Sequence, residues 1–462
     1  MKTMVKAERL LGGLLIGLGV MGSVSVAWAN PFEKTLENGL KVIVKEDRRA
    51  PTAVHMVWYR AGAMDEVDGQ SGVAHLLEHL MFKGTPNVPS GEFNKRVAAA
   101  GGRDNAFTSL DYTAYFQQIP KDKLDEMMKL EADRMWHLTL DPKEFASELK
   151  VVIEERRLRT EDQPGATLYE QLNAVAYQAH PYRRPVIGWM NDLENMTVED
   201  AKEWFDTWYV PNNATVVVVG DVDYKQVFKM AEKHYGGMPP GALPKRKPRE
   251  EPDQKGVRRI NVKAPADLPQ LLMHFKVPGI RDVEKDVDSY ALEMLSAVLD
   301  GHDAARIPRA LVKEGRIAVS AGAGYGGANR GPTSFTLSGS PAPGKTVADL
   351  EAALRAEVAR VAKDGVSEDE LARARNQLIA SEVFKRDSMF AQAMEMGQME
   401  TIGFSWKDSD RMIEKLKRVT PDQVKSVAGK YFGDDQLTVG VLDPQPLPAV
   451  GARRAASSGG RH

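Results

Sequence analysis

A long internal repeat is the feature that most restricts the possible folds of this chain. Residues 197–219 align without gaps with residues 420–442. Each copy opens with a threonine three residues before Asp or Gln, the pattern of a capped helix start, and ends in an apolar run typical of a buried strand. A helix that leads into a buried strand, present twice, predicts a duplicated fold with two similar α/β halves.

Composition between and beyond the copies predicts the domain boundaries. Residues 239–255 are rich in proline and charged side chains, which is typical of a linker. We therefore expect an N-terminal half at residues 30–238 and a C-terminal half at residues 256–445. Residues 446–462 are rich in Gly, Ala and Arg, a composition that predicts a disordered tail.

The N-terminal residues 1–29 have the pattern of a secretory signal peptide. Basic residues precede an apolar stretch from Leu10 to Val26, and Ala27-Trp28-Ala29 is a small-x-small cleavage pattern. We expect cleavage after Ala29 and a periplasmic location. The alternative is a retained membrane anchor, for which the apolar stretch is short.

Composition also excludes or disfavours several functions. The chain has no cysteine, so thiol catalysis is excluded. Its 62 basic and 64 acidic residues give no electrostatic support for nucleic-acid binding. Residues 322–327 formally satisfy G-x-G-x-x-G, but no helical pattern follows them, so we expect a strand-to-strand connection and not a nucleotide loop.

One short segment places two imidazoles and a carboxylate together. The apolar residues around it follow helical spacing, so His75 and His79, one turn apart, project from the same face. Two neutral imidazoles can share one zinc ion at about 2.0–2.1 Å each, and Glu78 beside them can take a proton from a water molecule. The order H-x-x-E-H is a zinc-peptidase signature. The alternative is that both histidines are ordinary residues on a helix surface.

A zinc site of this kind needs a third protein ligand. Asp141-Pro142 has the pattern of an N-cap followed by proline in the first turn, and residues 143–159 are rich in helix formers. Glu148 and Glu155 are two turns apart on this predicted helix and share a face, whereas Glu154 points elsewhere. The alternative is that this acidic helix is merely a solvated face.

With these motifs in order, the chain resembles the M16 (pitrilysin and insulinase) metallopeptidase family, in its bacterial and mitochondrial-processing branch. Residues 75–85 resemble the signature helix, residues 101–108 and 111–115 the substrate-side strands, and residues 148–155 the downstream element. The resemblance implies an α+β fold of the LuxS/MPP-like metallohydrolase type. Such a fold has two homologous α/β sandwich halves, each a mainly antiparallel sheet covered by helices.

The resemblance also implies the roles of the candidate site residues. One Zn²⁺ per chain is expected, bound by His75, His79 and Glu155. Glu78 is then the catalytic base, and Glu148 supports the site. These roles predict a zinc metallopeptidase.

The same resemblance implies how substrate is held. A peptide is expected to add as a strand to a sheet edge near Asn105, Ala106 and Phe107, where main-chain hydrogen bonds supply much of the affinity. We therefore expect an endopeptidase for short unfolded peptides with broad sequence preference. The alternative is a non-catalytic subunit of the same fold with a structural or peptide-binding role.

The second half of the chain lacks the metal motif. Residues 71–84 align with residues 288–301, and in this register the three motif residues correspond to Leu292, Leu295 and Ser296. Leucine side chains cannot bind zinc. The C-terminal half is therefore expected to be a non-metal half.

A departure from the family pattern predicts a partner. Self-sufficient members have an Arg and a Tyr in the second half that contact the peptide, and this chain has Val312 and Val319 in those places. Neither valine side chain can donate a hydrogen bond. We therefore expect a heterodimer in which an M16-like subunit without the zinc motif supplies the pair. The alternative is local substitution by one of four residues: Arg306, Arg309, Arg316 or Tyr325.

Overall fold

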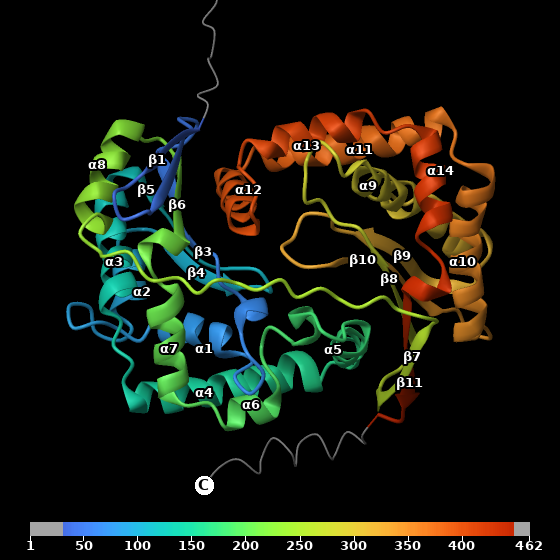
Figure 1. Cartoon of the computed structure of the whole chain (residues 1–462), viewed down its shortest axis with the longest axis horizontal. Helices are drawn as coiled ribbons and strands as arrows, with labels where there is room; N and C mark the ends of the chain where they lie inside the picture. Colours follow the sequence, from blue (N-terminus) through green and yellow to red (C-terminus); the bar gives the residue numbers. More distant parts are fainter. Residues whose placement is uncertain (1–30, 448–462) are drawn as a thin grey trace, which may run out of the picture.

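The structure, a computed structural model, describes residues 31–447 of the 462-residue chain. Two β-sheets, each with its own set of helices, lie side by side (Figure 1). The predicted signal peptide and all but the first two residues of the predicted tail lie outside the described residues. Among residues 31–447, no helix combines the length and apolar character needed to cross a membrane.

The N-terminal half is built on a six-stranded sheet with the order β1-β2-β6-β3-β5-β4. The β2–β6 pair is parallel and the other neighbouring pairs are antiparallel. The strands are β1 (Phe32–Thr35), β2 (Lys41–Glu46), β3 (Thr52–Tyr59), β4 (Arg103–Thr108), β5 (Thr113–Pro120) and β6 (Ala214–Gly220). The helices are α1 (Val73–Leu80), α2 (Glu92–Ala99), α3 (Leu124–His137), α4 (Pro142–Arg156), α5 (Pro164–Ala176), α6 (Met190–Glu194), α7 (Val198–Trp208) and α8 (Tyr224–Tyr235).

The C-terminal half is built on a five-stranded sheet with the order β7-β11-β8-β10-β9. The β7–β11 pair is parallel and the other pairs are antiparallel. The strands are β7 (Arg258–Pro265), β8 (Gln270–Val277), β9 (Ala318–Tyr325), β10 (Thr333–Pro341) and β11 (Leu437–Gln445). The helices are α9 (Val287–Asp300), α10 (Val347–Asp364), α11 (Glu368–Lys385), α12 (Met389–Ile402), α13 (Asp408–Lys417) and α14 (Pro421–Lys430). The expected pair of mainly antiparallel, helix-covered sheets is confirmed.

The structure also confirms the two capped helices of the repeat. Thr197 and Thr420 each accept a hydrogen bond from the backbone N–H three residues later, and the side chain there bonds back to the threonine N–H. α7 then leads into β6, and α14 leads into β11. Both strands join their sheet beside a parallel neighbour, β2 or β7. The duplication in sequence is therefore a duplication in topology.

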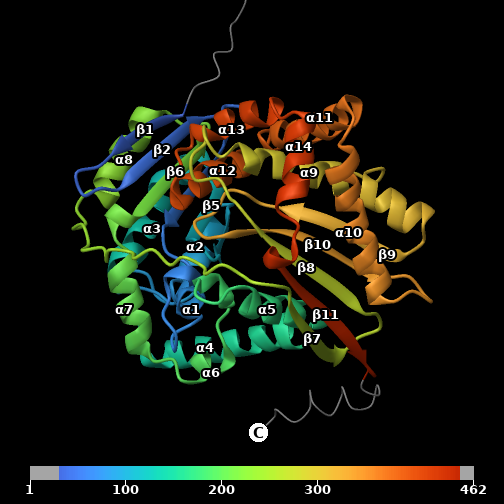
Figure 2. The same ribbon diagram turned by 45° about the vertical axis from the view of Figure 1, so that its right-hand side comes forward.

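The two halves exchange one helix each. α5 belongs to the N-terminal half but packs on β11 and β7, where Leu168 forms a small apolar core with Val262 and Leu442 (Figure 2). α12 belongs to the C-terminal half but packs on β6 and β3, where Met396 joins the core around Trp58. Because each sheet depends on a helix from the other half for part of its core, the halves form one interlocked unit.

Polar contacts tie the connecting segments to the N-terminal half. The predicted strand-to-strand connection is confirmed, since residues 326–332 join β9 to β10. From this connection Arg330 binds both carboxylate oxygens of Asp65 at 2.7 and 2.9 Å. Arg246, in the predicted linker, donates to the same carboxylate at 2.7 Å. Asp65 thus holds the linker and the C-terminal half near the start of α1.

Candidate metal centre

The position of α1 is fixed at its N-terminus. Gly72, with φ +92°, adopts the left-handed conformation at the helix start, where a Cβ would also press on the Ile187 carbonyl. Glu66 accepts hydrogen bonds from the backbone N–H groups of Gly72 and Ala74 at 3.1 and 3.0 Å, which satisfies donors that a helix start leaves unpaired. Burial raises the pKa of Glu66 to about 8. The apolar face of α1, including Leu76, Leu77 and Leu80, is buried in the core.

α4 begins as its sequence predicts. Asp141 accepts hydrogen bonds from the N–H groups of Lys143 and Glu144, and proline occupies the first turn. The α-helix ends at Arg156, before the end of the predicted range 143–159. Residues 157–161 then continue the chain as a π-helical turn. Glu154 points outward, as predicted, and its side chain is 62% exposed and paired with Arg157. α4 packs against α1 and so brings its other acidic residues toward the histidines.

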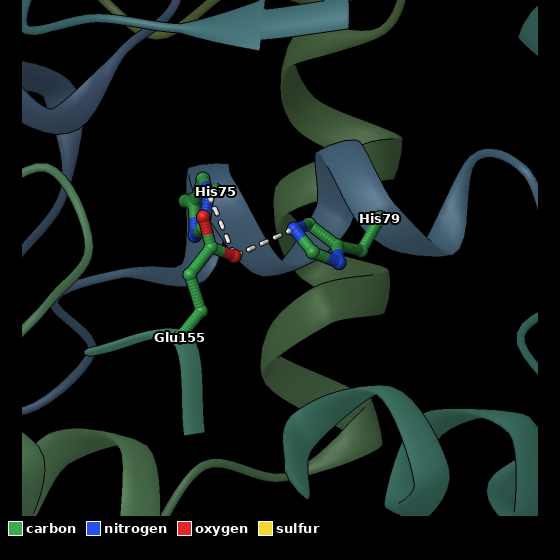
Figure 3. A group of neighbouring side chains, drawn as sticks. All are labelled: His75, His79 and Glu155. Carbon is green, nitrogen blue, oxygen red and sulfur yellow. Dashed lines mark ion pairs between the residues drawn. The ribbon is translucent and has the colours of Figure 1, made fainter. Parts of the chain in front are cut away.

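Two imidazoles and one carboxylate converge between α1 and α4 (Figure 3). Oε2 of Glu155 lies 3.3 Å from Nε2 of His79 and 3.9 Å from Nε2 of His75. One potential ligand atom from each residue lies within 4.8 Å of the others, and no second such group occurs among residues 31–447. The family resemblance predicts these three residues as the ligands, and the fold brings all of them together.

The chemistry of this group fits a zinc ion. Two nitrogen donors and one carboxylate oxygen make up a three-ligand set that leaves a further coordination position open. Burial, followed by the nearby charges of His79 and Arg159, lowers the pKa of His75 to about 3. His75 is therefore neutral at physiological pH, the form that binds a metal. Its Nδ1 is buried and has no hydrogen-bond partner among the described residues.

Glu148 lies behind His79. Its Oε2 is 3.2 Å from Nδ1 of His79, and its Oε1 is 2.6 Å from Nζ of Lys83. A carboxylate on one imidazole nitrogen fixes the ring so that the other nitrogen faces the metal position. Lys83 was not singled out from the sequence, and because it lies beyond the end of α1 at Leu80, the helical spacing of the motif does not predict its contact.

Glu78 points to a different neighbour. Its Oε2 accepts a hydrogen bond of 2.5 Å from Oγ1 of Thr108, at the end of β4. Burial raises the pKa of Glu78, while the Thr108 hydrogen bond and the charge of His79 act in the opposite direction. Thr108 belongs to the segment that carries the family resemblance, but nothing in its spacing from Glu78 indicated this contact.

The three predicted substrate-binding residues lie on an edge strand. β4 pairs with β5 on one side and has no strand on its other side among the described residues. Asn105 is exposed, whereas the Phe107 ring packs edge-on against Trp58 with ring centroids 5.4 Å apart. No strand pairs with this edge of β4 among the described residues, and the Phe107 side chain is already engaged in the core.

The equivalent helix of the C-terminal half has no such group. α9 buries Leu292 and Leu295 completely in its own core. Just as α1 packs against α7, α9 packs against α14, so the two helices hold equivalent places. The predicted absence of metal ligands at these positions follows directly from the residues there.

Comparison with known proteins decides the family. Residues 41–189 match the family model described as insulinase (peptidase family M16), and residues 195–378 match the M16 inactive domain. The chain belongs to the M16 peptidase family. Zinc protease PqqE from Helicobacter pylori is 37% identical over 322 residues, which is 68% of this chain and 71% of the relative.

Other relatives extend the similarity over most of the chain. A probable mitochondrial-processing peptidase subunit beta from Arabidopsis thaliana is 27% identical over 434 residues, covering 90% of this chain and 78% of the relative. The crystal structure of a protease from Helicobacter pylori superposes with a TM-score of 0.85 and 31% identity, covering 90% of this chain and 100% of that one. The M16 architecture of two sheet-and-helix halves is therefore shared along nearly all of the described residues.

Proposed function

We propose that this M16 chain is a zinc-dependent endopeptidase, with one Zn²⁺ bound by His75, His79 and Glu155. The observation that carries the proposal is the convergence of one potential ligand atom from each of these residues within 4.8 Å, with Glu78 on the same helix as the two histidines. Bound zinc would act as a Lewis acid toward the scissile carbonyl and would lower the pKa of a nearby water. The names of relatives such as zinc protease PqqE support this assignment.

The side chains of the chain supply the proton transfers. Glu78 takes a proton from the attacking water and later returns it to the leaving amine. Because water itself attacks the carbonyl, no acyl-enzyme forms. Thr108 donates to one oxygen of Glu78 and so holds the carboxylate in place. Glu148, itself paired with Lys83, keeps the His79 ring oriented.

The open edge of β4 supports the proposed substrate class. An extended peptide can add beside Asn105, Ala106 and Phe107 as a further antiparallel or parallel strand, with its main chain hydrogen-bonded to the β4 backbone. Only an unfolded segment can offer a free strand. Short unfolded peptides are therefore the proposed substrates.

The contacts of the C-terminal half support a heterodimer. The family resemblance places Val312 and Val319 where self-sufficient members have an Arg and a Tyr that contact the peptide. Two of the four possible local substitutes are engaged within their own half. Arg306 binds Glu370 through two hydrogen bonds of 2.7 Å, and the Tyr325 hydroxyl donates to the Pro278 carbonyl at 2.6 Å. An M16-like partner without the zinc motif would supply the missing donors, and this chain would be the catalytic subunit.

Metal analysis and a peptidase assay test this proposal together. The purified chain is expected to bind about one zinc per molecule and to cleave unfolded peptides in a chelator-sensitive way, weakly alone and strongly with its partner. A metal-loaded chain that stays inactive with every co-purifying M16 subunit would instead support the alternative, a non-catalytic structural or peptide-binding subunit.

The cellular location is a separate proposal. The pattern of residues 1–29 supports export to the periplasm with cleavage after Ala29. N-terminal sequencing of the chain recovered from a periplasmic extract tests it. A mature chain that begins at Asn30 is the expected result, and a chain that keeps its first residues in the membrane fraction would contradict it.

A further inference from the structure

A cavity of about 400 Å³ opens directly beside the candidate metal ligands. His75, Thr108 and Glu155 line it, together with residues of α5 and of the segment 182–187. Its volume lies within the range of about 300–1,000 Å³ that is typical of small-ligand pockets. The cavity therefore has room for a substrate side chain next to the bond that the metal centre would cleave.

Part of the cavity wall is apolar. The aliphatic lining residues come from three separate segments of the N-terminal half, and they are Leu110, Ala166, Pro185, Val186 and Ile187. Such a wall can pack against the methylene groups of a side chain. It does not by itself select the chemistry of the group at the end of that side chain.

Most charged residues around the cavity already have partners. Glu170 is bound by two nitrogens of Arg156 at 2.8 and 2.9 Å. Arg183 and Arg184 both bind Asp68, at 2.6 and 2.8 Å. Glu170 is therefore neutralised by a group outside the metal centre, whereas Arg183 and Arg184 share the single carboxylate of Asp68.

Arg159 is different. Its side chain is 74% exposed, and its one ion-pair partner among the described residues is Glu155, whose Oε1 lies 2.5 Å from Nη1. The other oxygen of Glu155 faces the two histidines. Once Glu155 shares its charge with a divalent cation, the guanidinium of Arg159 is left without a full anionic partner at the mouth of the cavity.

We propose that this cavity is a substrate subsite in which Arg159 binds a carboxylate of the peptide. The guanidinium presents its N–H donors as a planar fork that matches the two oxygens of a carboxylate. The carboxylate belongs either to an Asp or Glu side chain near the scissile bond or to the C-terminus of the peptide. This inference rests on the proposed function and adds a specificity-determining residue to it.

Binding to an inactive variant tests the subsite without relying on turnover. Zinc-loaded Glu78→Gln protein is titrated with short fluorescent peptides that carry Glu or Gln at each position in turn, with a free or an amidated C-terminus. We expect at least one carboxylate-bearing peptide to bind about tenfold or more tightly than its neutral twin, the size of a charge-assisted hydrogen bond. Adding Arg159→Gln should abolish this preference and leave the affinity for neutral peptides within about twofold.

Two further variants separate recognition from structure. Arg157→Gln is the matched control, because Arg157 lies in the same π-helical turn but pairs with Glu154 and does not line the cavity. It should keep the full preference. Arg159→Lys keeps the charge but loses the planar fork, so an intermediate preference is expected. All of these proteins are compared at full zinc occupancy, with the zinc content measured for each, because Arg159 also pairs with Glu155.

Each outcome decides between the proposals. Three results would overturn the subsite. They are a carboxylate preference that survives in Arg159→Gln, equal affinity for every charged peptide and its neutral counterpart, and no binding of any peptide. A preference that follows the free C-terminus supports it and identifies the chain end as the source of the carboxylate. Wild-type hydrolysis with no acidic preference would remove only the subsite, whereas zinc binding without hydrolysis in the presence of a partner would remove the proposed peptidase.

Discussion

α1 and α9 hold equivalent places in the two halves, yet they present opposite chemistry to their surroundings. α1 directs His75, Glu78 and His79 toward α4 and β4, whereas α9 buries leucines at two of the three matching positions. The fold can therefore be built with an apolar helix at this place. The polar set in the N-terminal half is an addition that the fold does not need.

That addition has to be balanced locally. Burying a charged group without a partner destabilises a protein, and each carboxylate of the site has a partner. Thr108 donates a hydrogen bond to Glu78. Lys83 forms an ion pair with Glu148, and Arg159 forms one with Glu155. The C-terminal half provides an internal reference, because its matching leucines need no such partners.

The largest expected effect comes from a variant of the N-terminal half that cannot bind the metal. Glu155→Ala should lose both zinc binding and peptidase activity, because two imidazoles alone do not complete the ligand set. In wild type, zinc at a hundred times its Kd should raise the free energy of unfolding by about 2.7 kcal/mol, and the variant should not respond. Calorimetric unfolding with and without zinc measures this difference.

Glu154→Ala is the matched control for that experiment. Glu154 is the adjacent residue on α4, but its side chain is 62% exposed and points away from the histidines. This variant should keep its metal and its response to zinc. Loss of zinc binding in both variants would contradict the ligand assignment.

The next effect separates chemistry from metal binding. Glu78→Gln should keep zinc but lower kcat by about 10²–10⁴-fold, the usual contribution of a general base. Substantial turnover by this variant would refute the role of Glu78. Steady-state kinetics on one unfolded peptide, together with metal analysis of the same sample, measures both quantities.

A third prediction compares the two exchanged helices. A Cβ on Gly397 of α12 would overlap the buried Trp58 ring, so Gly397→Ala should lower the free energy of unfolding by about 1–3 kcal/mol. On the other side, a Cβ on Gly440 would lie 3.1 Å from methyl carbons of Leu168 and Leu172, which can move, so Gly440→Ala should cost less. Urea denaturation measures both free energies.

Gly324→Ala provides the control for these glycine variants. Gly324 lies in strand β9, and a Cβ there would meet no atom within 4 Å. It should leave the free energy of unfolding nearly unchanged. If all three variants unfold alike, close packing of the exchanged helices is not what stabilises the interlocked halves.

Local signals in the sequence predicted local features of the structure. The capping boxes at Thr197 and Thr420 and the cap at Asp141 each involve residues within one helical turn, so the sequence pattern contains the whole interaction. The spacing of His75 and His79 likewise predicted a shared face. The third candidate ligand required a family resemblance, because nothing local brings α4 against α1.

Features that depend on packing between distant segments could not be predicted. Thr108 and Glu78 are 30 residues apart, and no periodicity relates a strand end to a helix face. The exchange of α5 and α12 was also missed, because an apolar helix face indicates burial but does not identify the sheet that buries it.

The last expected effect is a pH-dependent slope in stability caused by Glu66, which anchors α1. Its pKa is about 8 in the folded protein against 4.5 for the ordinary carboxyl, so between these pH values the folded state binds more protons than the unfolded one. The contribution of Glu66 to stability is therefore complete below about pH 4.5 and is lost as the pH rises toward 8. Glu66→Gln stays neutral throughout. The difference in free energy of unfolding between wild type and variant should fall by at most about 1.4 kcal/mol per pH unit across this interval, measured by urea denaturation of the metal-free proteins. Parallel curves for the two proteins would mean that the N–H groups of Gly72 and Ala74 keep Glu66 ionised.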